Sequence, residues 1–203
     1  VRGGCVIRKQ VLHNRLGTRI AEIDAQAFWR GCGPCLGIAR AGLHKLLVQQ
    51  ASGLHVRFGV TVQALRQHED HVSVELSDGG KEAYDFIVGA DGIRSSVRRL
   101  EFGHSEPSFR GQAGWRFTVR RPAGLDDWTA FLGRGSAFLM LPISEDWAYC
   151  YADQSSDRAA TDSAQGGVER LREHFADYAP PVCEVLARLG PADPIHFSAI
   201  EEV

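Results

Sequence analysis

The chain has 203 residues, of which 44% are hydrophobic and 24% are charged, and its formal net charge at pH 7 is −2. This balance is typical of a globular protein with a substantial core, and it argues against charge-driven binding to nucleic acid or to a membrane surface. No apolar run approaches the roughly 20 residues of a membrane-spanning helix, and the first residues lack the apolar stretch of a signal peptide. We therefore expect a cytoplasmic protein.

The first part of the chain predicts a hairpin followed by a helix. Residues 5–14 and 19–28 are expected to form two strands, joined by a turn that contains Asn14. A loop rich in glycine, cysteine and proline follows at 30–37. Leucines at helical spacing then predict a helix from about residue 41 to residue 52.

The next segment predicts a small antiparallel meander. We expect strand character at 56–65, at 72–76 and again at 84–88, with a turn at Asp78-Gly79-Gly80 between the second and third strands. The last of these strands contains the apolar run Phe86 to Val88, which predicts a buried strand.

The residues Gly89, Ala90, Asp91 and Gly92 follow that apolar run and precede a predicted helix. Small residues allow the backbone to approach a ligand closely, and a helix start offers unpaired N–H groups and positive potential. Asp91 adds a carboxylate at the carboxyl end of a strand, where open α/β sheets bind ligands. The pattern, with Arg94 in the first helical turn, predicts a site for a phosphate or pyrophosphate group.

The residue pattern in the second half of the chain is typical of an antiparallel sheet with covering helices. Alternating or apolar runs predict strands at 115–119, 130–132, 137–142 and 147–151. A polar stretch at 153–167 is expected to be a loop. Amphipathic helices, interrupted at Pro180-Pro181, are predicted from apolar residues at helical spacing: Val168, Leu171, Phe175, Val182, Val185, Leu186 and Leu189.

The stretch from Asp85 to Arg98 resembles the DG motif of FAD-dependent aromatic hydroxylases, the p-hydroxybenzoate hydroxylase-like flavoprotein monooxygenases. In that family the segment reads DxxVGADGxxSxVR, and here it reads DFIVGADGIRSSVR. Residues Arg40 to Leu47 also resemble the family's R-x-x-L…L segment, whose arginine lies against the bound FAD. A guanidinium suits that role because it presents several fixed donors to phosphate or carbonyl oxygens.

The resemblance implies a mixed α/β fold in which part of a Rossmann-like FAD-binding domain is interleaved with an antiparallel-sheet substrate domain and its covering helices. The implied division is a substrate-domain hairpin and loop at 1–35, an FAD-domain portion at 36–102 and the substrate sheet with its helices at 103–203. The cofactor-binding residues that it implies are Arg40, Gly89, Ala90, Asp91, Gly92 and Arg94.

The activity that the resemblance implies is hydroxylation of an aromatic or polyketide-like small molecule, with FAD as cofactor, NAD(P)H as co-substrate and O₂. The segments Trp115–Val119 and Phe138–Pro142 could line an aromatic pocket, although large apolar residues on a sheet more often form core. No pattern identifies a catalytic residue. Substrate, choice of nicotinamide cofactor and oligomeric state are not determined by the sequence.

The sequence also departs from the family pattern. The G-x-G-x-x-G that should hold the FAD pyrophosphate is absent, since Gly31, Gly33 and Gly37 have the wrong spacing, and the family's second flavin motif, a GD-containing strand, is absent too. Met140 is the sole methionine. We therefore expect an interior portion of a longer enzyme, inactive by itself, with a non-catalytic fragment or substrate-binding remnant as the alternative.

Cys32-Gly-Pro-Cys35 supports a different hypothesis, because it is identical to the thioredoxin active-site tetrapeptide. A thioredoxin requires a helix that starts at the second cysteine, and Gly37 weakens a helix there. Thiol redox activity is therefore the less favoured alternative. The remaining cysteines and the histidines are scattered and complete no zinc-binding pattern, so we expect no metal site.

Overall fold

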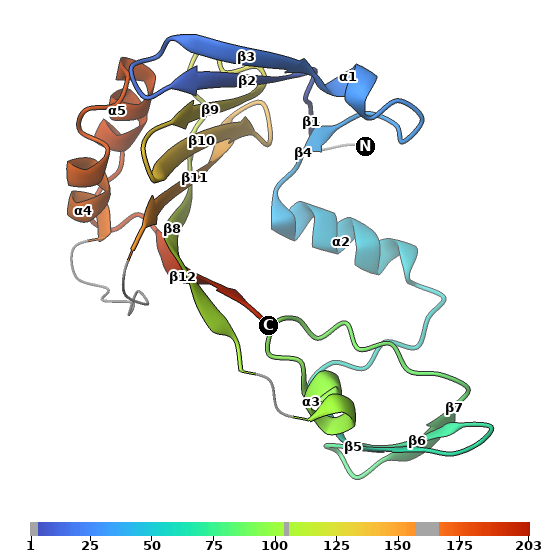
Figure 1. Ribbon diagram of the computed structural model, residues 1–203. Helices are drawn as coiled ribbons and strands as arrows, with labels where there is room; N and C mark the ends of the chain where they lie inside the picture. The colour runs from blue at the N-terminus through green and yellow to red at the C-terminus, as the bar shows by residue number, and fades with distance from the viewer. Residues whose placement is uncertain (1–3, 104–105, 157–166) are drawn as a thin grey trace. The chain divides into compact units, whose positions relative to one another are not determined.

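The computed structural model describes residues 4–103, 106–156 and 167–203 (Figure 1). It contains two compact units: Val1–Gln50 with Gly111–Ile200, and Ala51–Arg110 with Glu201–Val203. The chain passes between the units after Gln50 and within two strands, β8 (Ser108–Arg120) and β12 (His196–Glu202). The predicted division at 1–35, 36–102 and 103–203 remains a prediction.

A seven-stranded sheet forms the centre of the first unit, in the order β12-β8-β11-β10-β9-β2-β3. Its other strands are β2 (Lys9–Asn14), β3 (Arg19–Asp24), β9 (Trp128–Leu132), β10 (Ser136–Pro142) and β11 (Trp147–Ser155). In the run β8-β11-β10-β9, each strand is antiparallel to its neighbours. The strands β2 and β3 are also antiparallel to each other, but β2 pairs with β9 in parallel. The four strands predicted from 115 to 151 therefore form an antiparallel run as expected, and the hairpin joins this run by one parallel pair, which needs a long crossover connection.

Two helices, α4 (Gly167–His174) and α5 (Pro180–Ala187), cover one face of this sheet (Figure 1). Phe138 of β10 and Phe175 at the end of α4 are fully buried and lie edge to face, with ring centroids 5.4 Å apart. Trp115 of β8 is 1% exposed and also contacts Phe175 edge to face. Trp115 and Phe138, which could have lined a substrate pocket, are therefore core residues.

Local sequence signals explain most of the remaining elements of this unit. Asp24 ends β3 because its carboxylate accepts hydrogen bonds from the N–H groups of Gln26 and Ala27, which starts the short helix α1 (Ala25–Phe28). The prediction of a strand through 28 is wrong for that reason. The strands β1 (Cys5–Val6) and β4 (Leu36–Gly37) pair with each other, and the predicted helix is confirmed as α2 (Arg40–Gln50).

At the other end of the chain, the predicted amphipathic helices are confirmed as α4 and α5. Pro180 and Pro181 mark the start of the second helix, since a first helical turn needs no N–H donors. The strand β12 was not predicted. The loop expected at 153–167 lies largely outside the described residues, and its first part, through Ser155, belongs to β11.

The second unit is a three-stranded antiparallel meander of β5 (Val62–Gln67), β6 (Val72–Leu76) and β7 (Lys81–Tyr84), with the helix α3 (Ser96–Phe102) against β5. The meander confirms the predicted order, although its first strand begins at Val62 and not at Val56. Val74 is the one fully buried hydrophobic side chain among the described residues of this unit.

The prediction of a buried strand at 86–88 is wrong in this structure. Phe86 and Val88 are 76% and 75% exposed, and the backbone there belongs to no strand. A strand needs a hydrogen-bonding neighbour, and no described strand pairs with this segment.

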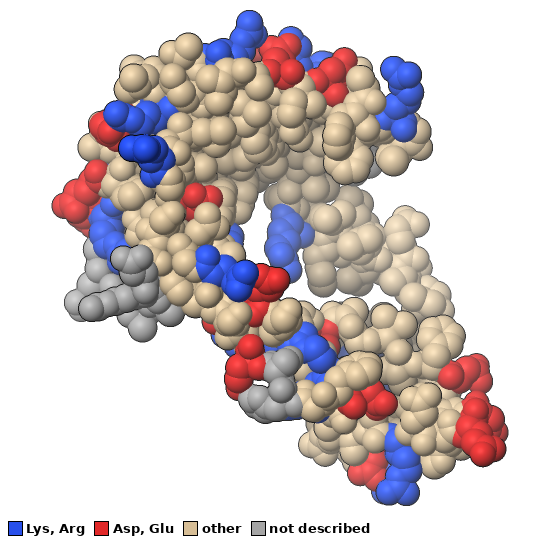
Figure 2. All heavy atoms as spheres, viewed as in Figure 1, with Lys and Arg blue, Asp and Glu red and all other residues tan. Residues whose placement is uncertain are grey.

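Basic and acidic side chains are interspersed on the face shown in Figure 2, with no large patch of one sign. None of the helices in the described part of the chain has the length and apolar character that crossing a membrane requires.

Candidate functional site

The predicted phosphate-binding turn is organised around the carboxylate of Asp91. This carboxylate accepts hydrogen bonds from the backbone N–H groups of Ser96, at 2.6 Å, and Val97, at 3.1 Å, and from the hydroxyl of Ser95. The Ser95 hydroxyl in turn accepts the N–H of Arg98 at 2.9 Å. The N–H groups at the start of α3 are thus occupied from within the chain, and this differs from the expectation that they face a phosphate.

These hydrogen bonds also set the charge state of Asp91. They lower the pKa of its carboxyl group, with the Ser95 hydroxyl making the largest contribution. Asp91 is therefore an ionised, oriented carboxylate at the surface. Such a group repels phosphate but accepts hydrogen bonds from hydroxyl or N–H groups of a ligand.

The two glycines of the motif are required for different reasons. A Cβ on Gly89 would lie 2.8 Å from Cγ1 of Val97, so this glycine allows the segment before the turn to pack against α3. Gly92 has a φ of +84°, and a Cβ there would have no atom within 4 Å. Gly92 therefore gives the turn its backbone conformation and leaves open space beside it.

The other predicted cofactor-binding residues lie at the surface. Ala90 is exposed, and Arg94 forms a 2.9 Å ion pair with Glu201 of the same unit. Arg40 is exposed at the first residue of α2. Arg40 belongs to the first unit, whereas Gly89, Ala90, Asp91, Gly92 and Arg94 belong to the second, where they form one turn.

A close backbone contact fixes the segment that leads to Arg40. A Cβ on Gly37 of β4 would lie 2.1 Å from the carbonyl oxygen of Pro142, so only glycine permits β4 to approach the end of β10. Two residues separate Gly37 from the start of α2. The position of Arg40 relative to the sheet of the first unit therefore depends on this contact.

The structure adds a polar cluster that the sequence analysis missed, on the sheet face opposite α4 and α5. It consists of Arg116 from β8 and Tyr149, Tyr151 and Asp153 from β11, all half-buried. The guanidinium of Arg116 lies 5.3 Å from the ring centroid of Tyr151 and donates a 2.8 Å hydrogen bond to Ser198 of β12. We call these four residues the polar sheet cluster.

Partial burial raises the pKa values of the Tyr149 and Tyr151 hydroxyls and of the Asp153 carboxyl group. The phenols therefore stay protonated near neutral pH and can donate hydrogen bonds. The signal that could have revealed the cluster is the two-residue period: Arg116 lies between the core residues Trp115 and Phe117, and Cys150 separates the two tyrosines.

Cys32 is exposed and Cys35 is half-buried, and Cys35 directly precedes the strand β4. A helix start that would stabilise a thiolate is therefore missing from this C-x-x-C, and the geometry does not support a thioredoxin-like site. Among the described residues, no group of three or more His, Cys, Asp or Glu side chains could hold a metal ion.

A family model described as an FAD binding domain matches residues 12–179. The chain belongs to this FAD-binding monooxygenase family. The match confirms the resemblance on which the sequence analysis relied, and it covers both the segment around Arg40 and the turn around Asp91.

Relatives within the FAD-binding monooxygenase family are longer than this chain. The chain is 28% identical over 165 residues to an FAD-dependent urate hydroxylase of Klebsiella pneumoniae, and the alignment covers 79% of this chain and 43% of the relative. It is 32% identical over 166 residues to the 2-heptyl-3-hydroxy-4(1H)-quinolone synthase of Pseudomonas aeruginosa, covering 77% of this chain and 42% of that enzyme. The chain thus spans less than half the length of these relatives.

The fold agrees with solved members of the family. The crystal structure of Klebsiella pneumoniae HpxO complexed with FAD and uric acid matches with a TM-score of 0.85 and 25% identity, covering 98% of this chain and 52% of the other. A salicylate hydroxylase substrate complex matches with a TM-score of 0.75 at 18% identity, covering 98% of this chain and 55% of that one. The predicted mixed α/β fold of a partial FAD monooxygenase is confirmed.

Proposed function

We propose that this chain is the part of an FAD-dependent monooxygenase that carries the DG turn and the substrate sheet, and that the enzyme hydroxylates an aromatic or polyketide-like small molecule with NAD(P)H and O₂. The observation that carries the proposal is the family match over residues 12–179, which includes the turn at Asp91 and the polar sheet cluster. A cytoplasmic location is part of this proposal.

The residues around Asp91 fit part of a flavin dinucleotide. The open space beside Gly92 allows a ligand to approach the backbone, and the oriented carboxylate of Asp91 can accept hydrogen bonds from sugar-type hydroxyl groups. Arg40 supplies a guanidinium that suits a phosphate or a carbonyl oxygen. FAD, when bound, supplies the electron transfer and oxygen chemistry that no side chain can provide.

The polar sheet cluster is our candidate for the substrate-binding surface. The protonated phenols of Tyr149 and Tyr151 can donate hydrogen bonds, and Arg116 can neutralise an anionic oxygen on an aromatic ring. Gly114 supports the arrangement, because a Cβ there would lie 3.1 Å from the Tyr151 ring. Uric acid, the molecule in the HpxO structure, is a planar ring compound of the kind that such a surface would accept.

The test is to reconstitute the purified chain with FAD, remove free flavin by gel filtration, and measure retained flavin by absorbance and fluorescence. We expect retention that Asp91→Ala weakens. Asp70→Ala is the control and should leave retention unchanged, because Asp70 is an exposed aspartate of the same unit that lies outside the motif. Flavin-loaded protein is then supplied with NAD(P)H, O₂ and urate or salicylate, and product is measured by chromatography.

The outcomes separate the enzyme from its main alternative. Retained flavin with a hydroxylated product supports the monooxygenase. Retained flavin without NAD(P)H oxidation agrees with a portion that is inactive by itself. The same assay on a longer chain that includes the G-x-G-x-x-G segment then decides, and absence of oxidation there favours a non-catalytic fragment or substrate-binding remnant. If no flavin is retained at millimolar FAD, the cofactor role proposed for this chain is wrong.

A further inference from the structure

The sheet face that carries the polar sheet cluster changes from polar to apolar from one strand to the next. The register places one residue of each strand directly opposite a residue of its neighbour, so these residues form a single row across the face. We call it the cross-sheet row, and from β8 to β3 it consists of Arg116, Tyr151, Leu139, Ala130, Leu12 and Ala21. The first two residues belong to the polar sheet cluster, and the other four are apolar.

The apolar part of the cross-sheet row keeps accessible surface. Leu139 and Leu12 are half-buried, whereas Ala130 between them is 2% exposed. The helices α4 and α5 pack on the other face of the sheet, and α2 has no buried residue and so does not cover this one. A ligand on the polar sheet cluster can therefore extend onto the two leucines.

The cross-sheet row is longer than an aromatic ring. Neighbouring strands of a sheet lie about 4.8 Å apart, so Tyr151 and Leu12 are separated by about 14 Å, with β10 and β9 between them. A ring bound at Arg116 and Tyr151 leaves the residues beyond Leu139 uncovered. A ligand that covers them as well must carry an apolar substituent that extends toward β2.

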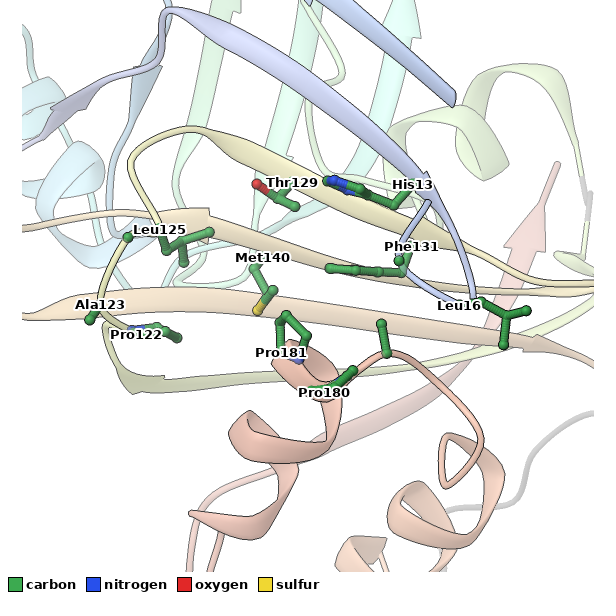
Figure 3. A pocket seen from close by; sticks show the side chains of 13 residues that line it. His13, Leu16, Pro122, Ala123, Leu125, Thr129, Phe131, Met140, Pro180 and Pro181 are labelled. Atoms are coloured by element: carbon green, nitrogen blue, oxygen red, sulfur yellow. The ribbon is translucent and has the colours of Figure 1, made fainter. Parts of the chain in front are cut away.

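A cavity of about 480 Å³ on the opposite face, between the sheet and the beginning of α5, lacks this combination (Figure 3). Met140, Thr129 and Phe131 line it, and along β10 and β9 they alternate with the members of the cross-sheet row. The described side chains that line the cavity include no Asp, Glu, Lys or Arg, so it offers no charged partner to an acidic ring. A ligand that is acidic at one end and apolar at the other is matched by the cross-sheet row and not by the cavity.

We propose that the substrate of the polar sheet cluster is amphiphilic: an aromatic ring that bears an acidic or hydroxyl oxygen and carries an unbranched apolar chain. The oxygen interacts with Arg116 and Tyr151, and the chain runs over Leu139 and Ala130 toward Leu12. Each CH₂ group of the chain that leaves water adds affinity that the ring alone does not have. The inference rests on the proposed function, because it names the substrate class of the same site.

The test compares three ligands that share one ring: salicylate, 4-hexylsalicylate, and a salicylate with an ethylene-glycol ether of the same length at that position. Binding to the intact chain is measured by titration in two-dimensional NMR spectra without flavin. We expect 4-hexylsalicylate to bind about tenfold to a hundredfold more tightly than salicylate, and the ether to gain less than about threefold. The shifts that the hexyl group adds should be largest at Leu139, Ala130 and Leu12.

Variants locate the chain of the ligand. Leu139→Asn keeps the approximate size of the side chain and removes its apolar surface, so it should reduce the gain from the hexyl group to about threefold or less. Leu16→Asn is the matched control and should keep the full gain, because Leu16 is 66% exposed and lines the cavity on the opposite face. Equal affinity of the three ligands, an equal gain from the hexyl and ether chains, or added shifts centred on Met140 and Phe131 would each overturn the proposal, even if Leu139→Asn fails to fold.

The outcomes also distinguish this proposal from the proposed function. If flavin is retained and salicylate binds but the hexyl group adds nothing, the amphiphilic substrate is wrong and the proposed function stands. If none of the three ligands binds at millimolar concentration, the polar sheet cluster is not a substrate surface and the amphiphilic substrate is wrong with it. If the hexyl group adds affinity but no flavin is retained, only the cofactor role of this chain is wrong.

Discussion

The carboxylate of Asp91 accepts the backbone N–H of Ser96 at 2.6 Å. The residue that most resembles a cofactor ligand in the sequence therefore also holds the start of α3. Ligand binding and local stability are coupled at this position, and a substitution of Asp91 will affect both.

We predict that Asp91→Ala, which removes the acceptor oxygens, frays the beginning of α3. In the folded chain the pKa of Asp91 is lowered, so its stabilising effect is complete above the ordinary aspartate pKa of about 3.9 and is lost as pH falls through the lower folded pKa. Amide hydrogen exchange should show that Ser96 and Val97 lose protection at acid pH, whereas in Asp91→Ala they are poorly protected at every pH. Protection that does not depend on pH in the parent chain would contradict this.

We predict that Gly89→Ala destabilises the second unit by about 1–3 kcal/mol, through overpacking against Val97. The double variant Gly89→Ala/Val97→Ala should recover part of that loss, because the clashing methyl groups are removed. Urea unfolding followed by circular dichroism measures both. Strictly additive effects would show that Gly89 and Val97 are not in contact.

We predict that Phe175→Ala lowers the free energy of unfolding of the first unit by about 3–5 kcal/mol, because Phe175 is fully buried among aromatic rings. Phe102→Ala is the matched control, since Phe102 is 83% exposed, and it should change stability by less than about 0.5 kcal/mol. Thermal unfolding followed by near-ultraviolet circular dichroism distinguishes them. Comparable losses in both variants would be inconsistent with the packing described.

We predict that Arg116→Gln weakens binding of urate or salicylate to the flavin-loaded protein about tenfold, as expected for one charge-assisted hydrogen bond. Arg120→Gln is the control, because Arg120 lies on the same strand but packs over Trp147, with its guanidinium 4.7 Å from the ring centroid. Calorimetric titration measures both. An equal loss in the two variants would point to net charge and not to the polar sheet cluster.

We predict that thiol reagents distinguish the cysteines. Burial raises the pKa of Cys150 to about 12, and this side chain has no exposed surface, so its thiolate population at pH 8 is negligible. Cys32 is exposed and should react first. Mass spectrometry after brief alkylation should find Cys32 modified and Cys150 modified only in urea. Early modification of Cys150 in the folded chain would contradict its placement in the core.

The sequence by itself determined the family and much of the local structure. The DG motif, the hairpin, α2 and the meander are all specified by residues close together in the chain: turn glycines, alternating apolar residues and helical spacing. These signals depend on local backbone preferences. They predict the helices and strands, whereas the flavoenzyme family was implied by the resemblance of the segment from Asp85 to Arg98 to the DG motif.

Only the tertiary structure decided the features that depend on distant partners. The parallel pairing of β2 with β9, the exposure of Phe86 and the close approach of Gly37 to Pro142 each depend on which neighbour is present, and spacing along the chain does not encode this. The pairing of β8 with β11, which brings Arg116 beside Tyr151, also appeared only in the structure, whereas the two-residue period could show only that both side chains leave the core face. The contact between Asp91 and Ser96 needed both sources. The motif that contains Asp91 is visible in the sequence, but only the structure shows that the Asp91 carboxylate accepts the N–H groups at the start of α3.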